Sequence, residues 1–199
     1  DALRDGLRAA GFPVDGFVLD LNWFGGIDPD NPAESAMGRL DWDENDNELL
    51  TRNAYHFPNP AERVQQYAED HIGLTAIEES YLAFPVRTYI TMPAPLTVYQ
   101  RTGGVCDPDT QRYPVTFVTG FWGVGRMIDW SDEAAGRWFH DERRYPNLAR
   151  LGINAHWTDL GEPETFHAAG CYEGVETTTA GVKNEHSDIH NLYNLLWNG

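Results

Sequence analysis

Three short apolar runs recur along the chain, at residues 14–24, 74–84 and 153–159. Continuous apolar runs of this length are typical of strands buried on both faces of a parallel sheet. Each run carries acidic residues toward its end, and these are Asp20, Glu78, Glu79 and Asp159. An ionised carboxylate is costly there unless it is paired or takes part in chemistry. The strand ends are therefore the first place to look for function.

Segments with helical signals separate these runs. Residues 1–10 predict the end of an amphipathic helix. Residues 59–73 predict a second helix, in which Asn59 is the N-cap and Pro60 takes the first helical position. Gly73 is expected to end that helix, because glycine commonly follows the last helical residue.

Residues 131–152 predict a third helix, with Ser131 as its N-cap and Gly152 releasing the chain into the last apolar run. The alternation of helix and strand predicts an α/β protein built from right-handed βαβ units. Acids at the carboxyl ends of such strands are typical of a (β/α) barrel, whose active sites lie at that face. A closed barrel needs eight strands and about 250 residues. The pattern alone therefore leaves two alternatives, a doubly wound open sheet or part of a barrel.

Two segments interrupt the alternation. Residues 25–53 are rich in Gly, Pro, Asp and Asn, which predicts a long loop. Residues 84–120 combine prolines and glycines with β-prone pieces. That mixture predicts an insertion with antiparallel strand character.

Composition narrows the classes of function. The chain has 199 residues, is 41% hydrophobic and carries 14 basic and 31 acidic residues, a net charge of −17. A core of ordinary size is therefore possible, and the negative field opposes binding to nucleic acid or to an anionic membrane. No apolar run approaches the roughly 20 residues that span a bilayer. Aromatic residues, 13% of the chain, lie beside acids rather than among Lys and Arg, which suits neutral polyhydroxylated ligands.

Cysteine usage leaves the redox compartment open. Cys106 and Cys171 are the two cysteines, and a pair this far apart is compatible with a disulfide or with two reduced thiols. Neither lies in a CxxC spacing, so neither indicates metal or redox chemistry.

Signals for metal or cofactor binding are weak. Residues 41–52 place oxygen ligands at alternate positions, but they lack the glycine and the final glutamate of a calcium loop. His186, Asp188 and His190 form a possible zinc set, yet the same stretch also reads as the start of a helix. The GVGRMI segment (123–128) lacks the third glycine of a dinucleotide loop. We therefore expect no metal and no cofactor.

Five blocks of sequence resemble, in the same order, successive blocks of glycoside hydrolase family 31, a group of α-glucosidases, α-xylosidases and related α-transglucosidases. The blocks are GFPVDGFVLDLNWF (11–24), FPNPAERV (57–64), GFWGVGRMIDWSDEAAGRWF (120–139), WTDLGEPE (157–164) and HNLYNLLW (190–197). The resemblance runs from about Gly11 to Trp197, nearly the whole chain. The block of the form WxDxxEP at a strand end is fairly specific.

The resemblance implies a (β/α)8 TIM barrel, of which residues 1–199 would be a partial catalytic domain. They would supply the second to fourth strands, with their helices and an insertion at 84–120. Asp159 would be the nucleophile of a retaining mechanism. In the family the acid/base is a different Asp two strands further along, so it would lie after Gly199, and Glu162 would not take that role. We expect the isolated chain to be inactive or nearly so, and the rest of the polypeptide or other subunits to complete the barrel.

Three further residues match positions that contact the sugar in the family. Asp20 matches an acid that hydrogen-bonds sugar hydroxyls, and Trp122 matches an aromatic wall of the same subsite. Leu82 matches an apolar contact that follows an acid-Pro pair, and here that pair is Glu79-Ser80. We expect Asp20 and Asp159 to share one rim of the sheet, and the inner face of the sheet to lie open or be covered by neighbouring chains.

The resemblance implies an enzyme that acts on α-glucosidic bonds of oligosaccharides or α-glucans. Two alternatives stay open. The DLGEPE wording at 159–164 is closer to members that transfer glucosyl units between α-glucans, which indicates a 4-α-glucosyltransferase. A non-catalytic carbohydrate-binding scaffold would keep the same acids and Trp residues without turnover.

Overall fold

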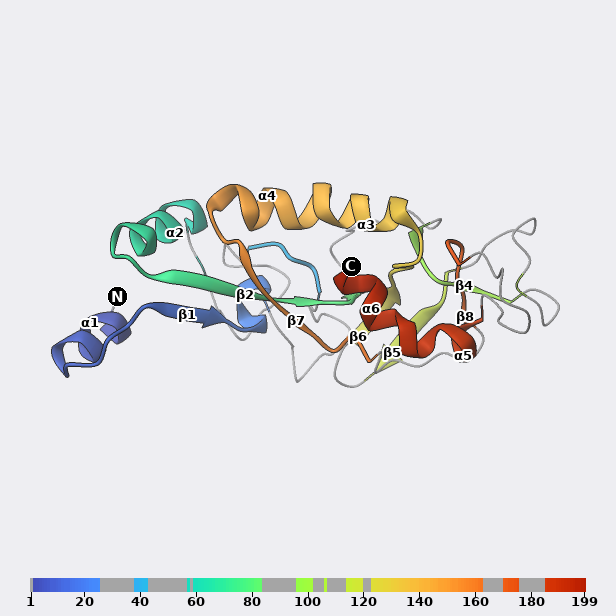
Figure 1. Ribbon diagram of the computed structural model, residues 1–199, viewed down its shortest axis with the longest axis horizontal. Coiled ribbons are helices and arrows are strands. Elements are labelled where there is room, and N and C mark those ends of the chain that lie inside the picture. Colours follow the sequence, from blue (N-terminus) through green and yellow to red (C-terminus); the bar gives the residue numbers. More distant parts are fainter. Residues whose placement is uncertain are drawn as a thin grey trace.

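A parallel sheet of three strands lies at the centre of the described chain, in the order β1–β2–β7 (Figure 1). Its strands are β1 (Gly16–Leu19), β2 (Gly73–Glu79) and β7 (Ala155–Asp159). The computed structural model describes residues 2–25, 38–42, 57, 59–83, 96–101, 106, 114–119, 123–162, 170–175 and 185–199. Each strand overlaps one of the three apolar runs, so the sequence prediction of a parallel sheet is confirmed.

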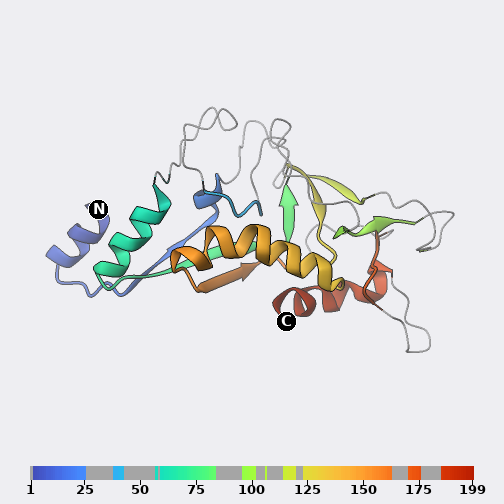
Figure 2. The ribbon, with the colours of Figure 1, turned by 90° about the horizontal axis from the view of Figure 1, so that it is seen from above.

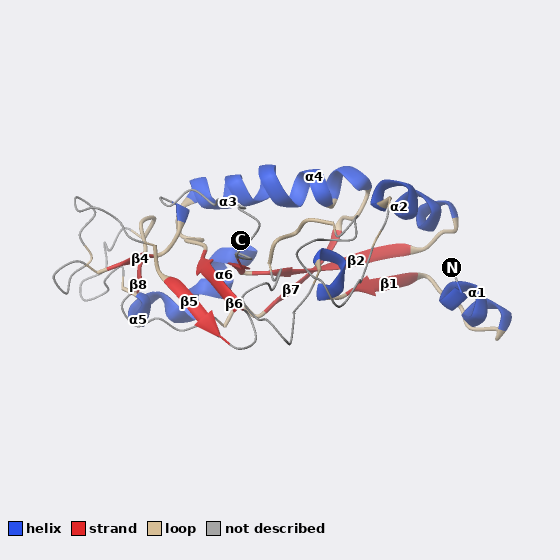
Figure 3. Cartoon of the chain, turned by 180° about the vertical axis from the view of Figure 1, so that it is seen from behind, coloured by secondary structure: helices blue, strands red, loops and turns tan. Residues whose placement is uncertain are grey.

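Helices cover one face of this sheet. After α1 (Ala2–Ala9) and β1, helix α2 (Pro60–Glu69) leads into β2. The helical segment before β7 consists of α3 (Glu133–Phe139), a π-helical turn (His140–Arg144), α4 (Tyr145–Asn147) and a 3-10 turn (Ala149–Leu151). Figures 1 and 3 show α2 and α3–α4 on the same side of the strands. Sequential strands with their crossover helices on one face wind in a single direction. This is barrel winding, because a doubly wound sheet places helices on both faces.

Antiparallel strands extend beyond the carboxyl ends of the parallel ones (Figure 3). β3 (Tyr81–Ala83), β6 (Gly123–Met127) and β5 (Thr116–Thr119) form a sheet in the order β3–β6–β5. β4 (Tyr99–Gln100) pairs antiparallel with β8 (Gly170–Cys171). β4 and β5 fall within 84–120, and the bounds of an insertion there stay a prediction.

The C-terminal part of the chain is helical. It contains α5 (His186–Ile189), a 3-10 turn (His190–Leu192) and α6 (Tyr193–Asn198). Within the described ranges, no helix combines the length and the apolarity that crossing a bilayer requires.

Two of the predicted strands end well before their apolar runs do. The run at 74–84 does not form one strand, because β2 ends at Glu79, Ser80 forms a bend, and β3 joins the antiparallel sheet. The run at 14–24 contains β1 followed by a 3-10 turn, η1 (Leu21–Phe24). In both runs apolar residues continue past the strand because they are buried in the core on the far side of the turn.

The ends of the helix predicted at 59–73 are partly wrong. Asn59 precedes the helix, but its side chain makes no capping hydrogen bond and its φ is 54°, in the left-handed region. The helix ends at Glu69 rather than at the glycine, and His71 takes the left-handed conformation with φ 59°. Gly73 is instead the first residue of β2. A histidine therefore occupies the turn for which the sequence rule favours glycine.

The N-cap predicted for the helix at 131–152 is displaced by one residue. Asp132 is the N-cap, and its carboxylate accepts a hydrogen bond from the Ala134 N–H. The Ser131 hydroxyl instead donates to Asp129 Oδ1 at 2.5 Å. Gly152 ends this helical segment with φ 101°, as predicted.

Asp129 joins the start of α3 to the segment that follows β8. Its buried carboxylate accepts hydrogen bonds from the Ser131 N–H and from the Glu173 N–H, the second at 2.6 Å. Burial raises the pKa of Asp129 to about 6, against the opposing effect of these hydrogen bonds. The carboxylate thus fixes residues 170–175 against the α3 N-terminus.

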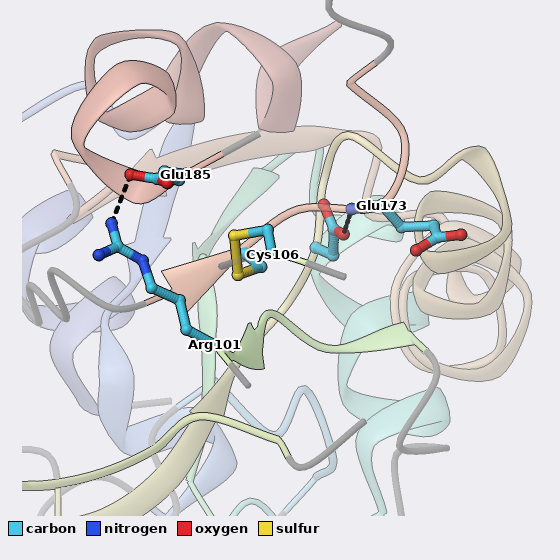
Figure 4. The surroundings of a disulfide bond; sticks show 6 residues. Arg101, Cys106, Glu173 and Glu185 are labelled. Atoms are coloured by element: carbon cyan, nitrogen blue, oxygen red, sulfur yellow. Dashed lines mark hydrogen bonds and ion pairs between the residues drawn. A yellow bond between two sulfur atoms is a disulfide. The ribbon is translucent and has the colours of Figure 1, made fainter. Parts of the chain in front are cut away.

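A disulfide bond connects Cys106 to Cys171 in β8, which decides between the two alternatives that the sequence left open. Figure 4 shows that it lies between two further polar contacts. On one side Arg101 Nη2 lies 2.5 Å from Glu185 Oε2, and on the other the Glu173 N–H donates to Asp129. The disulfide therefore ties together segments that are 65 residues apart in the sequence.

Removing this disulfide should destabilise the protein that contains the chain. A Cys106→Ser/Cys171→Ser double variant is expected to lose about 2–4 kcal/mol of unfolding free energy, because the cross-link restricts the unfolded chain. Urea unfolding of both proteins, each with and without reductant, measures this. Reductant should shift the wild-type midpoint by more than the midpoint of the variant. Equal wild-type and variant midpoints without reductant would contradict the prediction.

Candidate active site

Three carboxylates lie at one edge of the parallel sheet. Asp159 is the last residue of β7, Glu79 is the last residue of β2, and the two stand opposite each other in register. Asp20 directly follows β1, whose last residue pairs with Ala76. Since the strands are parallel, all three acids lie at the carboxyl edge, where the active sites of (β/α) barrels are formed.

Strand geometry places these acids on one face. Val18 pairs with Thr75, and Ile77, two residues further along β2, pairs with Trp157. Side chains alternate between the faces of a strand, so Asp159 follows Trp157 on the same face and Glu79 follows Ile77. Val18 and Trp157 are 59% and 40% exposed, so the face that leads up to the acids is partly open.

Local hydrogen bonds fix Asp20 at the start of η1. Its backbone is extended, and its Oδ1 accepts a hydrogen bond from the Leu21 N–H at 2.7 Å. The 3-10 turn is fastened to the sheet because Trp23 donates from Nε1 to the Ile77 carbonyl at 3.1 Å. Asp20 itself is exposed. It is a solvent-accessible carboxylate in a defined orientation.

Asp159 is half-buried, and the chain turns sharply after it. Leu160 has φ 58°, in the left-handed region, and its carbonyl accepts a hydrogen bond from the Ser80 hydroxyl at 2.9 Å. Gly161 is packed against α6, so that an added Cβ would lie 2.7 Å from Asn194 Oδ1. The turn thus ends β7 at Asp159 and leaves that carboxylate at the rim.

A model of the glycosyl hydrolases family 31 TIM-barrel domain matches residues 1–199. The chain belongs to glycoside hydrolase family 31. This confirms the family and the partial TIM barrel expected from the five sequence blocks. No match was found among curated proteins.

Solved structures of family 31 enzymes share the fold. A GH31 α-xylosidase from a soil metagenome, complexed with xylose, has a TM-score of 0.65 and 17% identity, covering 97% of this chain and 23% of that one. The GH31 dextranase of Flavobacterium johnsoniae, complexed with glucose, has a TM-score of 0.61 and 17% identity, covering 98% and 20%. A GH31 sulfoquinovosidase from E. rectale has a TM-score of 0.61 and 15% identity, covering 98% and 25%. The chain therefore spans a quarter or less of these enzymes.

Three candidate residues named from the sequence remain, and these are Leu82, Trp122 and Glu162. Leu82 lies in β3 with its side chain completely buried in the hydrophobic core, so it faces no open surface in this structure. Trp122 lies outside the described residues. Glu162 is exposed beyond the turn that follows Asp159.

Glu78 differs from the other strand-end acids because it points to the opposite face of β2. Its carboxylate is completely buried and lies 2.8 Å from Arg144 Nη2 and 2.5 Å from His156 Nδ1. Burial opposes ionisation, but the close contact with His156 and the hydrogen bonds from Arg144 outweigh it and lower the pKa of Glu78. This ion-pair network joins β2 and β7 to the helical segment before β7. Figure 2 shows this helical segment lying along the two strands. Glu78 is therefore a structural residue in this family 31 domain.

The sequence did not assign a functional role to Glu79. Its side chain is completely buried and stands next to Asp159 on the same face. The alternation of side chains along β2 separates it from Glu78, but the pairing of Glu79 with Asp159 depends on strand register. The sequence alone does not give that register.

The possible zinc ligands His186, Asp188 and His190 lie in α5 and in the 3-10 turn that follows it. His186 is buried, and its Nδ1 lies 2.7 Å from the Tyr172 hydroxyl. Across the described ranges, no group of three or more His, Cys, Asp or Glu side chains is placed to hold a metal ion. Of the calcium-like segment at 41–52, residues 43–52 lie outside the described residues.

Proposed function

We propose that the complete protein is a retaining glycoside hydrolase that cleaves α-glucosidic bonds of oligosaccharides or α-glucans, with Asp159 as its nucleophile. The observation that supports this most is the position of Asp159 at the carboxyl end of a parallel strand in a family 31 barrel domain. The carboxylate is half-buried at the rim, and the turn behind it is held by hydrogen bonding and packing.

The proposed chemistry uses Asp159 to attack the anomeric carbon. A bond forms between the carboxylate oxygen and that carbon while the glycosidic oxygen leaves with a proton from a second carboxylic acid, about 5 Å from the first in retaining enzymes. The transition state resembles an oxocarbenium ion, so positive charge develops beside Asp159. Glu79 is the neighbouring acid on the adjacent strand, in register with Asp159. The family resemblance assigns the acid/base to an Asp after residue 199.

Substrate contacts are proposed at Asp20, Trp122 and Leu82. Asp20 suits this role best in the structure, because its exposed carboxylate lies at the same edge as Asp159 and can accept hydrogen bonds from sugar hydroxyls. Trp122 and Leu82 rest on the family resemblance alone, and the complete burial of Leu82 in the core does not support its contact with a sugar.

The DLGEPE segment at 159–164 supports a second function, a 4-α-glucosyltransferase. The glycosyl-enzyme intermediate would be the same, and a sugar hydroxyl would replace water as the attacking group. Product analysis with maltotriose as sole substrate distinguishes the two: hydrolysis gives maltose and glucose without longer products, whereas glucosyl transfer gives maltose together with glucans longer than maltotriose.

Trapping the covalent intermediate in the complete protein tests the proposed nucleophile. A 5-fluoro-α-glucosyl fluoride combines a good leaving group with a fluorine that slows breakdown of the intermediate. We expect mass spectrometry to find one added fluoroglucosyl group on the peptide that contains Asp159, and none in an Asp159→Asn variant. A label on another carboxylate would remove Asp159 from this role, and a catalytically inert scaffold would take up no label.

A further inference from the structure

We propose that Ser80 is a positioning residue for Asp159. Its hydroxyl holds the left-handed turn at Leu160 and thereby sets the direction in which the Asp159 carboxylate points. The inference rests on the proposed role of Asp159 as nucleophile. It assigns a role in the reaction to a side chain on a neighbouring strand.

The turn after Asp159 needs support from its surroundings. Leu160 has φ 58°, a conformation that residues with a Cβ adopt rarely. Such a backbone persists only when neighbouring groups hold it. The Ser80 hydroxyl does so, because it donates to the Leu160 carbonyl at 2.9 Å across 80 residues of sequence.

Ser80 is itself held rigidly. It is completely buried in the bend between β2 and β3. Its carbonyl accepts a hydrogen bond from Trp130 Nε1 at 3.2 Å and lies 3.0 Å from the Tyr193 hydroxyl. Burial raises the pKa of Tyr193, so this phenol stays protonated and can donate. The serine hydroxyl therefore reaches Leu160 from a fixed backbone.

Helix α6 supports the turn from its other side. An added Cβ at Gly161 would lie 2.7 Å from Asn194 Oδ1 and 2.9 Å from the Trp197 ring, so the backbone after Leu160 is in close contact with the helix. The same helix carries Tyr193, which contacts the Ser80 carbonyl. The turn is thus enclosed between Ser80 and α6. Without the serine hydroxyl, packing against α6 would be left to hold the Leu160 peptide.

The expected consequence is a slower chemical step with little change in substrate binding. Asp159 and Leu160 share a peptide bond, so a relaxed turn rotates the carboxylate away from the line of attack. Small errors in the placement of a reacting group reduce rates strongly. Sugar-binding groups elsewhere at the rim, such as Asp20, lie on a different strand and keep their positions.

The test compares three variants of the complete protein, Ser80→Ala, Ser80→Thr and Ser131→Ala. Ser131 is a matched control because its hydroxyl also makes a hydrogen bond between distant segments, accepting from the Gly174 N–H at 3.0 Å, but the Leu160 turn is held by Ser80 instead. Covalent labelling by 5-fluoro-α-glucosyl fluoride is followed by mass spectrometry over time. The labelled fraction at saturation counts the folded sites, so each rate constant refers to active protein alone.

For Ser80→Ala we expect the maximal labelling rate at Asp159 to fall about tenfold, with the half-saturating concentration unchanged within about twofold. Ser80→Thr keeps the hydroxyl and should label faster per site than Ser80→Ala. Ser131→Ala should label at the wild-type rate.

Labelling of Asp159 at the wild-type rate in Ser80→Ala would overturn the inference and leave the proposed function intact. The inference would also be overturned if labelling were slowed equally in Ser80→Ala and Ser131→Ala. The same holds if labelling were slowed equally in Ser80→Ala and Ser80→Thr. A label on a residue other than Asp159 would instead overturn the proposed function.

Discussion

In the complete protein, replacing Asp159 with alanine should reduce turnover on the order of 10⁴-fold or more, as expected when an enzyme loses its nucleophile. The carboxylate is half-buried at a strand end, and its removal takes away no hydrogen bond that holds the turn, since that turn depends on Ser80 and α6. We therefore expect the melting temperature to change little. The measurements are kcat for an aryl α-glucoside and thermal unfolding of the same preparation.

Azide separates loss of the nucleophile from general damage. In Asp159→Ala a small anion can occupy the space of the missing carboxylate and attack the anomeric carbon from the same side. Azide should therefore restore part of the activity and give a glycosyl azide of inverted configuration, identifiable by NMR. If azide gave no glycosyl azide, or gave one of retained configuration, the assignment of Asp159 as the nucleophile would be contradicted.

Asp141→Ala is the matched control for Asp159→Ala. Asp141 is an exposed carboxylate on the helical segment before β7 and pairs with the exposed His140 ring. The variant loses the same charge and should keep wild-type turnover. Comparable losses in both variants would mean that net charge, rather than the nucleophile, limits the rate.

Replacing Glu78 with glutamine should lower the free energy of unfolding of this domain by about 3 kcal/mol. The carboxylate is completely buried between Arg144 and His156, and removal of its charge leaves the Arg144 guanidinium without its ionic partner. Arg144 is 28% exposed, so water compensates for part of the loss. The expected loss of unfolding free energy therefore lies at the lower end of the range for buried ion pairs that lose one partner. Urea unfolding at neutral pH measures the difference.

The effect should depend on pH in a defined direction. The pKa of Glu78 is lowered in the folded state, so its contribution to stability is complete above the unfolded pKa of about 4.3. That contribution is lost as the pH falls through the lowered folded pKa. The stability difference between wild type and Glu78→Gln should therefore shrink under acidic conditions. A difference that does not change with pH would show that lost packing, not lost charge, destabilises the variant.

Glu133→Gln is the control for Glu78→Gln. Glu133 pairs with Arg137 one helical turn along, and both side chains are exposed. Exposed pairs of this kind contribute little to stability. The variant should unfold within error of the wild type. A loss equal to that of Glu78→Gln would contradict the importance of burial.

The sequence by itself determined the order of the main elements and the acids at their ends. Apolar runs predicted the three parallel strands because burial on both faces leaves few polar positions within a strand. The WTDLGEPE block placed Asp159 at a strand end and indicated family 31, which the family match confirms. These features depend on residues that are close together in the chain, so the local pattern of apolar and polar residues is enough to predict them.

Only the tertiary structure decided the features that depend on partners distant in sequence. Glu78 and Glu79 are adjacent, yet one joins Arg144 under the helices and the other stands beside Asp159, because strand register pairs them with different neighbours. The sequence marked Ser80 only as a serine where the family resemblance expects a proline, and its partners, Leu160, Trp130 and Tyr193, are brought to it by folding. The cysteine spacing allowed both redox states, and the approach of β8 to residue 106 selected the bonded one. Hydrogen bonds and ion pairs between distant segments follow from packing, which a linear pattern does not encode.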